Sequence, residues 1–261
     1  MFPLVHYYIN KQVFGRVSPL CALGGLWPDL AAAAGGDRDA AHYQGAEFYA
    51  WCCQHLPQAK DAALGVIAHG VEPACVDYYA DEYWPDHVRG YMFRQALGYL
   101  PQVAACTGLE GETSLPPLPR GGEPPRNNVW WKAHNCVEIA YEILTSQAQP
   151  QLAAELLAAL AHTEAVELLA QALQGWQGLE PRRVRQVFAQ APESYALPDA
   201  GAACQAAKQA LVMKHRFSKF QVDQPALAAL LEQIARDEAD SYASFISLLT
   251  EKTAAQLRAF A

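Results

Sequence analysis

The chain contains a histidine and a glutamate four positions apart in the segment His134-Asn135-Cys136-Val137-Glu138. Residues four apart on an α-helix face the same side, one turn above each other, so both side chains can reach one metal ion. Other ligand-type residues precede this pair at wide intervals, in the order His6, Asp29, His42 and His69. Zinc accepts imidazole nitrogens and carboxylate oxygens, and a catalytic zinc also keeps a position for water. The spacing predicts a zinc site assembled from several helices.

Three carboxylates that follow His69 are further candidates. On a straight helix Glu72 lies about 4.5 Å along the axis from His69, near enough to reach the same ion. Asp77 lies about 12 Å along, which is too far unless Pro73 breaks the helix and redirects the chain. Asp81 follows Asp77 by one turn, and the two could face a second ion. Glu72 and Asp77 are therefore the candidates for accepting a proton from water activated by a metal.

Composition places the chain among globular proteins, because 52% of its 261 residues are hydrophobic and 18% are charged. The net charge of −8 gives no general electrostatic help in binding nucleic acid, which we do not expect as a partner. Two short basic clusters, at 182–185 and 214–216, are expected to be solvated faces. Seven cysteines without a CxxC spacing predict reduced, mostly buried thiols rather than a disulfide framework.

The beginning of the chain lacks the pattern of a signal peptide, and no apolar run approaches the roughly 18–20 residues of a membrane span. We therefore expect a soluble, cytoplasmic protein without a membrane span. The sequence leaves its oligomeric state open.

Helical periodicity dominates and strand alternation is absent, so the predicted fold is an all-α multi-helix bundle forming one domain over residues 1–261. Residues 1–145 would form its metal-site half, and 149–261 an Ala-rich helical half. Between them, the Pro-rich segment 108–128 is predicted to be a loop that could border the site. Residues 24–29 are expected to be a loop or the start of a helix. Residues 3–14 are expected to be a helix or a buried turn. The other expected helices cover 40–55, 59–82 (one helix, or two divided at Pro73), 86–106, 129–147, 149–174, 181–191, 199–216 and 224–259.

The candidate ligands lie in five short segments: His6-Tyr7-Tyr8-Ile9, Gly24-Gly25-Leu26-Trp27-Pro28-Asp29, Ala41-His42-Tyr43, Leu64-Gly65-Val66-Ile67-Ala68-His69 and Lys132-Ala133-His134-Asn135-Cys136-Val137-Glu138. In this order the segments resemble the zinc-dependent phospholipase C and single-strand nuclease superfamily. The resemblance covers roughly residues 1–145. It implies an all-helical fold, up to three zinc ions, and hydrolysis of a phosphodiester by a metal-bound hydroxide. The metal ligands that it implies are His6, Asp29, His42, His69, His134 and Glu138.

The chain departs from that family at two ligand positions. The family places an aspartate that bridges metals four residues after the third histidine, and another histidine six residues further on. Pro73 and Tyr79 occupy these positions here. His87 is a possible substitute ligand, and the number of ions stays open between one and three. Iron or manganese could replace zinc in such a donor set.

These features together predict a zinc-dependent hydrolase acting on a phosphoester, either a phosphodiester or a phospholipid-like small molecule. Two alternatives stay open. The protein could be a biosynthetic metalloenzyme that acts on a non-phosphate ester or amide, since fold does not fix function. It could also be a non-catalytic helical scaffold whose metal site has decayed.

Overall fold

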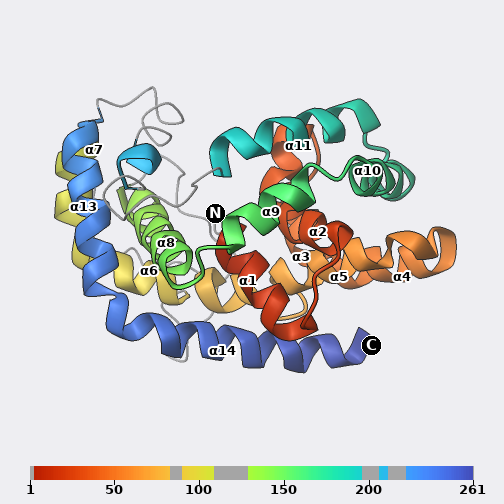
Figure 1. Ribbon diagram of the computed structural model, residues 1–261, viewed down its shortest axis with the longest axis horizontal. Helices are drawn as coiled ribbons and strands as arrows, with labels where there is room; N and C mark the ends of the chain where they lie inside the picture. Colours follow the sequence, from red (N-terminus) through yellow and green to blue (C-terminus); the bar gives the residue numbers. More distant parts are fainter. Residues whose placement is uncertain (1–2, 83–89, 109–128, 196–205, 211–221, 261) are drawn as a thin grey trace. The chain divides into compact units, whose positions relative to one another are not determined.

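A computed structural model describes residues 3–82, 90–108, 129–195, 206–210 and 222–260. Every regular element within these ranges is helical (Figure 1), which confirms the prediction of an all-α protein. The candidate ligand His87, the loop predicted over 108–128, the basic cluster 214–216 and most of the helix predicted over 199–216 lie outside the described residues.

The chain divides into two compact units, each built from separated stretches of sequence. The unit that contains the His134 helix comprises residues 1–2, 79–148 and 199–243, and we refer to it as the α8 unit. The other comprises residues 3–78, 149–198 and 244–261, and we refer to it as the α5 unit. Neither unit corresponds to the halves 1–145 and 149–261 expected within a single domain.

In the α5 unit, helix α2 packs against α1, α3, α5, α9 and α10 (Figure 1), and so forms much of the core. Its side chains from Leu20 to Pro28 are buried. The helices of this unit are α1 (Pro3–Phe14), α2 (Pro19–Leu30), α3 (Arg38–Tyr43), α4 (Gly45–His55), α5 (Lys60–His69), α9 (Leu152–Leu160), α10 (Thr163–Gln177), α11 (Pro181–Tyr195) and the later part of α14 (Ala239–Leu257).

Glycines allow α2 and α5 to pack with their backbones in contact. A Cβ at Gly24 would overlap the carbonyl oxygen of Ala62, and a Cβ at Gly65 would overlap that of Cys21. Only glycine permits so close an approach of two backbones. This crossing brings together the ends of the two helices that carry Asp29 and His69.

The expected loop or helix start at residues 24–29 lies inside α2. The helix begins earlier because Ser18 caps it, accepting a hydrogen bond from the Cys21 N–H at 3.1 Å, and Pro19 occupies the first turn. The sequence signal for this helix was therefore Ser18-Pro19, whereas the two glycines are explained by helix packing. Pro28 is accommodated near the C-terminal end of α2.

Helix α5 ends at His69, well before Glu82, where the predicted helical segment ended. A turn over Val71–Ala74 follows, and the chain then resumes in a short π-helical turn, Tyr78–Glu82. The Val71 N–H donates to the His42 carbonyl at 2.8 Å, which ties this turn to α3. Residues 59–82 therefore form two helical parts and not one helix, and Pro73 lies in the turn between them.

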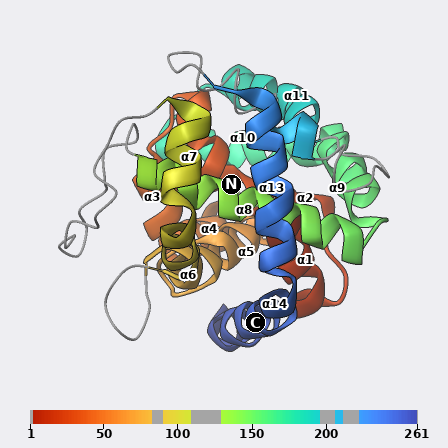
Figure 2. The same ribbon diagram turned by 90° about the vertical axis from the view of Figure 1, so that its left-hand side faces the viewer.

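Helix α8 (Val129–Ala148) is the centre of the α8 unit and agrees with the helix predicted over 129–147. It packs against α6 (Tyr91–Ala96), α7 (Leu100–Thr107) and α13 (Gln224–Asp237). Figure 2 shows α7 and α13 side by side. The Tyr141 hydroxyl donates to Glu238 Oε2 at 3.2 Å, so α8 is joined to the end of α13 by a buried hydrogen bond.

The described cysteines are free thiols, as predicted. Cys21, Cys52, Cys75, Cys106 and Cys136 are buried, whereas Cys53 is exposed. Burial raises the pKa of the Cys21 thiol to about 12, which keeps it protonated and unreactive.

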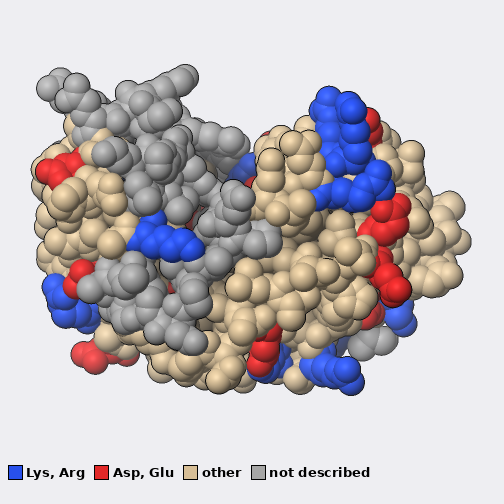
Figure 3. All heavy atoms as spheres, turned by 45° about the horizontal axis from the view of Figure 1, so that its top comes forward, with Lys and Arg blue, Asp and Glu red and all other residues tan. Residues whose placement is uncertain are grey.

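Basic side chains on α11 are partnered by acidic ones. Arg182 and Arg183 lie 2.6 and 3.3 Å from the Glu180 carboxylate, and Arg185 lies 2.7 Å from Glu167. On the described part of the face in Figure 3, blue and red side chains are interspersed. The cluster at 182–185 is thus a set of exposed ion pairs.

No helix in the described ranges has both the length and the apolar character needed to cross a bilayer.

Candidate metal centre

Three buried histidines of the α5 unit converge on the carboxylate of Asp77. His6 comes from α1, His42 from α3 and His69 from the last residue of α5. Asp29, near the end of α2, lies beside His6 and His69. We refer to these five residues as the histidine cluster.

The distances in the histidine cluster fit shared coordination of metal ions. Asp77 Oδ2 lies 3.1 Å from His69 Nε2 and 3.3 Å from His42 Nε2. Asp77 Oδ1 lies 3.4 Å from His6 Nε2. Two ligand atoms bound at about 2.0–2.2 Å to one tetrahedral ion lie roughly 3.3–3.5 Å apart. The spacing between donors therefore matches that expected around an ion.

Backbone carbonyls orient two of the imidazoles. His69 Nδ1 lies 2.7 Å from the Gly25 carbonyl, and His42 Nδ1 lies 2.7 Å from the Arg38 carbonyl. A carbonyl only accepts, so Nδ1 carries a proton in each ring and Nε2 is left as the donor atom for a metal. Both Nε2 atoms are buried without a hydrogen bond although they face a carboxylate oxygen. A cation between nitrogen and oxygen would satisfy both groups.

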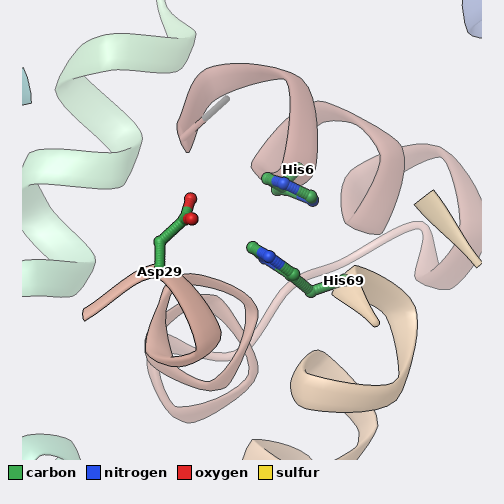
Figure 4. A group of neighbouring side chains, drawn as sticks. All are labelled: His6, Asp29 and His69. Carbon is green, nitrogen blue, oxygen red and sulfur yellow. The ribbon is translucent and has the colours of Figure 1, made fainter. Parts of the chain in front are cut away.

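Figure 4 shows the rings of His6 and His69 stacked, with the Asp29 carboxylate beside them. The ring centroids are 3.7 Å apart and the planes differ by 10°. One ligand atom from each of His6, Asp29 and His69 lies within 4.8 Å of the others. These three residues could hold an ion on the side of the cluster where Asp29 lies.

Protonation states of His6, Asp77 and Asp29 suit metal binding, whereas His69 is different: burial lowers its pKa, but Asp77 and Asp29 raise it above its ordinary value in the metal-free protein. Burial, together with neighbouring His69, lowers the pKa of His6 to about 3, so His6 is neutral. Burial raises the pKa of Asp77, but His69 and His42 outweigh it and hold that pKa well below its usual range. The pKa of Asp29 is lowered to about 2. Burial acts in the opposite direction, but nearby positive charge, including that of His69, outweighs it. Neutral imidazole and ionised carboxylate are the forms that bind metal.

The turn after α5 decides which carboxylate joins the cluster. Because α5 ends at His69, the chain doubles back through Pro73 and returns Asp77 to the three histidines. This is the condition under which Asp77 was expected to be a ligand. Glu72, the other candidate, lies in the turn, is exposed, and is not among the residues of the cluster.

A second group of donors lies in the α8 unit, and we refer to it as the α8 cluster. His134 Nε2 lies 2.9 Å from Asp81 Oδ1 and 3.6 Å from Glu138 Oε1. The Phe93 ring stacks on the imidazole, with centroids 4.0 Å apart. Burial lowers the pKa of His134, but Glu138 and Asp81 together raise it above its ordinary value. The predicted pair four residues apart does face one point, and Asp81 completes a possible three-ligand set.

Each of the six predicted ligands lies in one cluster or the other. The histidine cluster contains His6, Asp29, His42 and His69, and the α8 cluster contains His134 and Glu138. Asp77 and Asp81, which could have faced a second ion together, are divided between the clusters. Their four-residue spacing favours one shared helix face, so the sequence pattern did not predict this division. Tyr79 occupies the position where the family has a histidine ligand, and its side chain has neither an imidazole nor a carboxylate.

Comparison with known proteins finds no family model, no curated protein and no solved structure that matches this chain. The geometry of the two clusters is therefore the basis for assigning a function.

Proposed function

We propose that this protein is a metal-dependent hydrolase acting on a phosphoester, built on a helical bundle of the zinc-dependent phospholipase C type. The observation that carries the proposal is the convergence of three imidazole Nε2 atoms on the single carboxylate of Asp77. Backbone carbonyls already orient two of these rings for coordination. Such a buried, oriented donor set has no simple role in packing, since unpaired polar groups in a core cost stability.

We assign Asp77 the role of a ligand shared between ions. Its Oδ1 faces His6, whereas its Oδ2 faces His42 and His69. A carboxylate whose two oxygens face different histidines could bridge two ions, which in phosphoryl-transfer sites are typically about 3.5–4 Å apart. Asp77 thus takes the place of the bridging aspartate that the resemblance puts at the position of Pro73.

Asp29 would supply a further ligand beside His6 and His69. A bound zinc ion lowers the pKa of a coordinated water and stabilises negative charge on a phosphoryl oxygen. The protein's own contribution is to hold imidazole nitrogens and ionised carboxylates in fixed orientations. Asp29 is only partly buried, so this side of the cluster is reached by solvent. A small phosphoester is the substrate class that these charges and this access favour.

The first experiment measures metal per chain by elemental analysis, on protein purified without added metal or chelator, and hydrolysis of bis(4-nitrophenyl) phosphate. Asp77→Asn and Glu72→Gln form a matched pair, because each converts a carboxylate to an amide in the same segment. We expect Asp77→Asn to lose at least one ion and about 100-fold or more in rate. Of these two carboxylates, Asp77 is the buried one that faces the three histidines. Glu72→Gln should resemble the wild type.

Two other results would contradict the proposal. A metal-loaded wild type that is inert toward phosphodiesters, but active on carboxylic esters or amides, would favour the alternative metalloenzyme. A wild type that binds no metal, even when zinc is supplied, would favour a helical scaffold.

A further inference from the structure

A small hydrophobic cluster packs against both ends of the turn that separates His69 from Asp77. It consists of four buried residues, and we refer to it as the Leu257 cluster: Ile67, Ala68, Cys75 and Leu257. The first two directly precede His69, and Cys75 precedes Asp77 by two residues. Leu257 is the last residue of α14, in the same compact unit. One side chain that is distant in sequence therefore packs with both segments that present a ligand.

The end of α14 is fixed by further contacts with helices of the α5 unit. The Tyr49 hydroxyl, on α4, donates to the Phe260 carbonyl at 2.7 Å. The rings of these two residues also meet edge to face, with centroids 5.3 Å apart. Val13 and Phe14 of α1, and Leu64 of α5, pack against the Leu257 cluster. The end of α14 is thus joined to α1, α4 and α5, and two of these helices carry ligands of the histidine cluster.

Cys75 contributes to this packing and not to coordination. Its side chain is fully buried, and burial raises the pKa of the thiol to about 12, although Thr253 acts in the opposite direction. A thiol that stays protonated packs as a small apolar group and does not bind metal. Thr253 and Leu257 are one turn apart on α14, so they share a helix face. That face lies against the segment leading to Asp77.

The position of Asp77 depends on such tertiary contacts, because α5 ends at His69 and its hydrogen bonds do not extend through the turn. The beginning of the turn is tied to α3 by the Val71 N–H, which donates to the His42 carbonyl at 2.8 Å. Its end is held where Cys75 packs in the Leu257 cluster. A functional metal site needs its ligands within about 0.5 Å of the productive geometry. Removing buried volume from a core lets the surrounding groups relax into the space.

We propose that Leu257 is a positioning residue for metal binding at the histidine cluster. It acts through the other members of the Leu257 cluster on the orientation of His69 and Asp77, and it is not itself a ligand. This inference rests on the proposed function, because it requires that the histidine cluster binds metal. A smaller side chain at position 257 should weaken cation binding about 10-fold or more and change the geometry of the bound ion.

The test titrates metal-free full-length protein with cobalt(II) alone and follows visible absorption, which reports the arrangement of the ligands. A His42→Ala variant identifies the binding step that belongs to the histidine cluster. We expect Leu257→Ala to weaken that step about 10-fold or more and to alter its spectrum. Leu249→Ala is the matched control, because Leu249 is also buried on α14 but lies outside the Leu257 cluster. It should lower thermal stability as well, yet bind cobalt with the affinity and spectrum of the wild type.

Tyr49→Phe is a second variant that keeps the ring and removes only the hydroxyl that donates to Phe260. We expect it to weaken the same binding step by a smaller factor than Leu257→Ala does. If Leu257→Ala does not fold, a wild-type cobalt affinity and spectrum in Tyr49→Phe overturns the inference.

Four results separate the inference from the proposed function. If Leu257→Ala binds cobalt within about twofold of the wild type, with the same spectrum, the positioning role is wrong and the proposed function stands. If Leu257→Ala and Leu249→Ala weaken binding equally, the effect is one of general stability and the inference is overturned. If the wild type lacks a step that depends on His42, the metal assignment fails and the inference fails with it. If Leu257→Ala alone weakens and alters the step, but the wild type does not hydrolyse phosphoesters, the inference holds and the proposed reaction is wrong.

Discussion

At the scale of single residues, burial decides the chemistry of the histidine cluster. His6 is 2% exposed and stacks on His69, so protonating it would bury a second positive charge against a neighbouring imidazole. Asp77 is buried and remains ionised because histidines surround it. The residue types at these positions were enough to select them as candidate ligands. The protonation states follow from the neighbours, which only the folded chain provides.

These pKa shifts predict how the stability of the metal-free protein depends on pH. His6 has a folded-state pKa of about 3 against an ordinary value of 6.5, so the unfolded chain binds its proton first as pH falls. Stability should decrease by up to about 1.4 kcal/mol per pH unit between roughly pH 6 and 4 through this residue. His69 and His134 have raised pKa values, so the folded protein keeps their protons above pH 6.5, where the unfolded chain loses them. Through these two residues, stability should fall as the pH rises above 6.5.

Urea unfolding of chelated protein at a series of pH values measures this dependence. In a His6→Phe variant, which keeps an aromatic ring against His69, the loss of stability from pH 6 to 4 should be smaller. An unchanged slope in the variant would show that His6 does not cause the acid destabilisation.

At the scale of secondary structure, periodicity predicted where helical sequence lies but not where helices end. Residues 40–55 form α3 and α4, and residues 149–174 fall in α9 and α10. Asp37 caps α3, and His162 caps α10 by accepting the Ala165 N–H at 3.3 Å. Residues 86–106 contain α6 and α7, and 224–259 contain α13 and α14. Consecutive helices that face the same core keep the apolar pattern across their junction, so the pattern alone does not reveal the break.

The packing of α2 against α5 predicts a strong effect of added side-chain volume. Gly65→Ala would place a methyl group against the Cys21 carbonyl, and helix backbones cannot yield as a flexible side chain can. We expect a loss of about 1–3 kcal/mol in the free energy of unfolding, or more. The two helices would also separate, which should weaken metal binding because His69 and Asp29 lie at their ends. Denaturant unfolding and cobalt titration measure the two effects.

Gly98→Ala provides the control, since nothing lies within 4 Å of a Cβ built at this position. It should leave stability unchanged or slightly increased. Equal stability of Gly65→Ala and Gly98→Ala would contradict the role of the close backbone contact.

At the scale of the whole molecule, each candidate metal group joins parts of the chain that are distant in sequence. The histidine cluster draws on α1, α2, α3, α5 and the turn after α5, all within the α5 unit. The α8 cluster joins Asp81 to a helix that begins nearly fifty residues later. An ion bound at either place would cross-link these elements, and would bind the folded state far better than the unfolded chain.

Removal of metal is therefore expected to lower thermal stability. A ligand that binds only the folded state stabilises it by about 2.7 kcal/mol when present at 100 times its dissociation constant. Scanning calorimetry with and without EDTA should show a lower melting temperature after chelation, restored by added zinc. His55→Ala, at an exposed position outside both clusters, should keep this response, whereas Asp77→Asn should reduce it. A melting temperature indifferent to chelator and zinc would contradict metal binding by the folded protein.

The sequence by itself determined that the chain is helical and that its ligand-type residues are histidines and carboxylates in a fixed order. It also determined that His134 and Glu138 share a helix face, because four-residue spacing is a local property of the helix. Tertiary structure alone decided which distant donors meet. The straight-helix estimate favoured Glu72 as the neighbour of His69, but α5 ends at His69 and the turn returns Asp77 instead. That turn is held by the His42 carbonyl on another helix, and the meeting of Asp29 with His69 depends on backbone contact between α2 and α5. Such contacts between distant residues depend on the packing of the whole core, which a local pattern in the sequence does not encode.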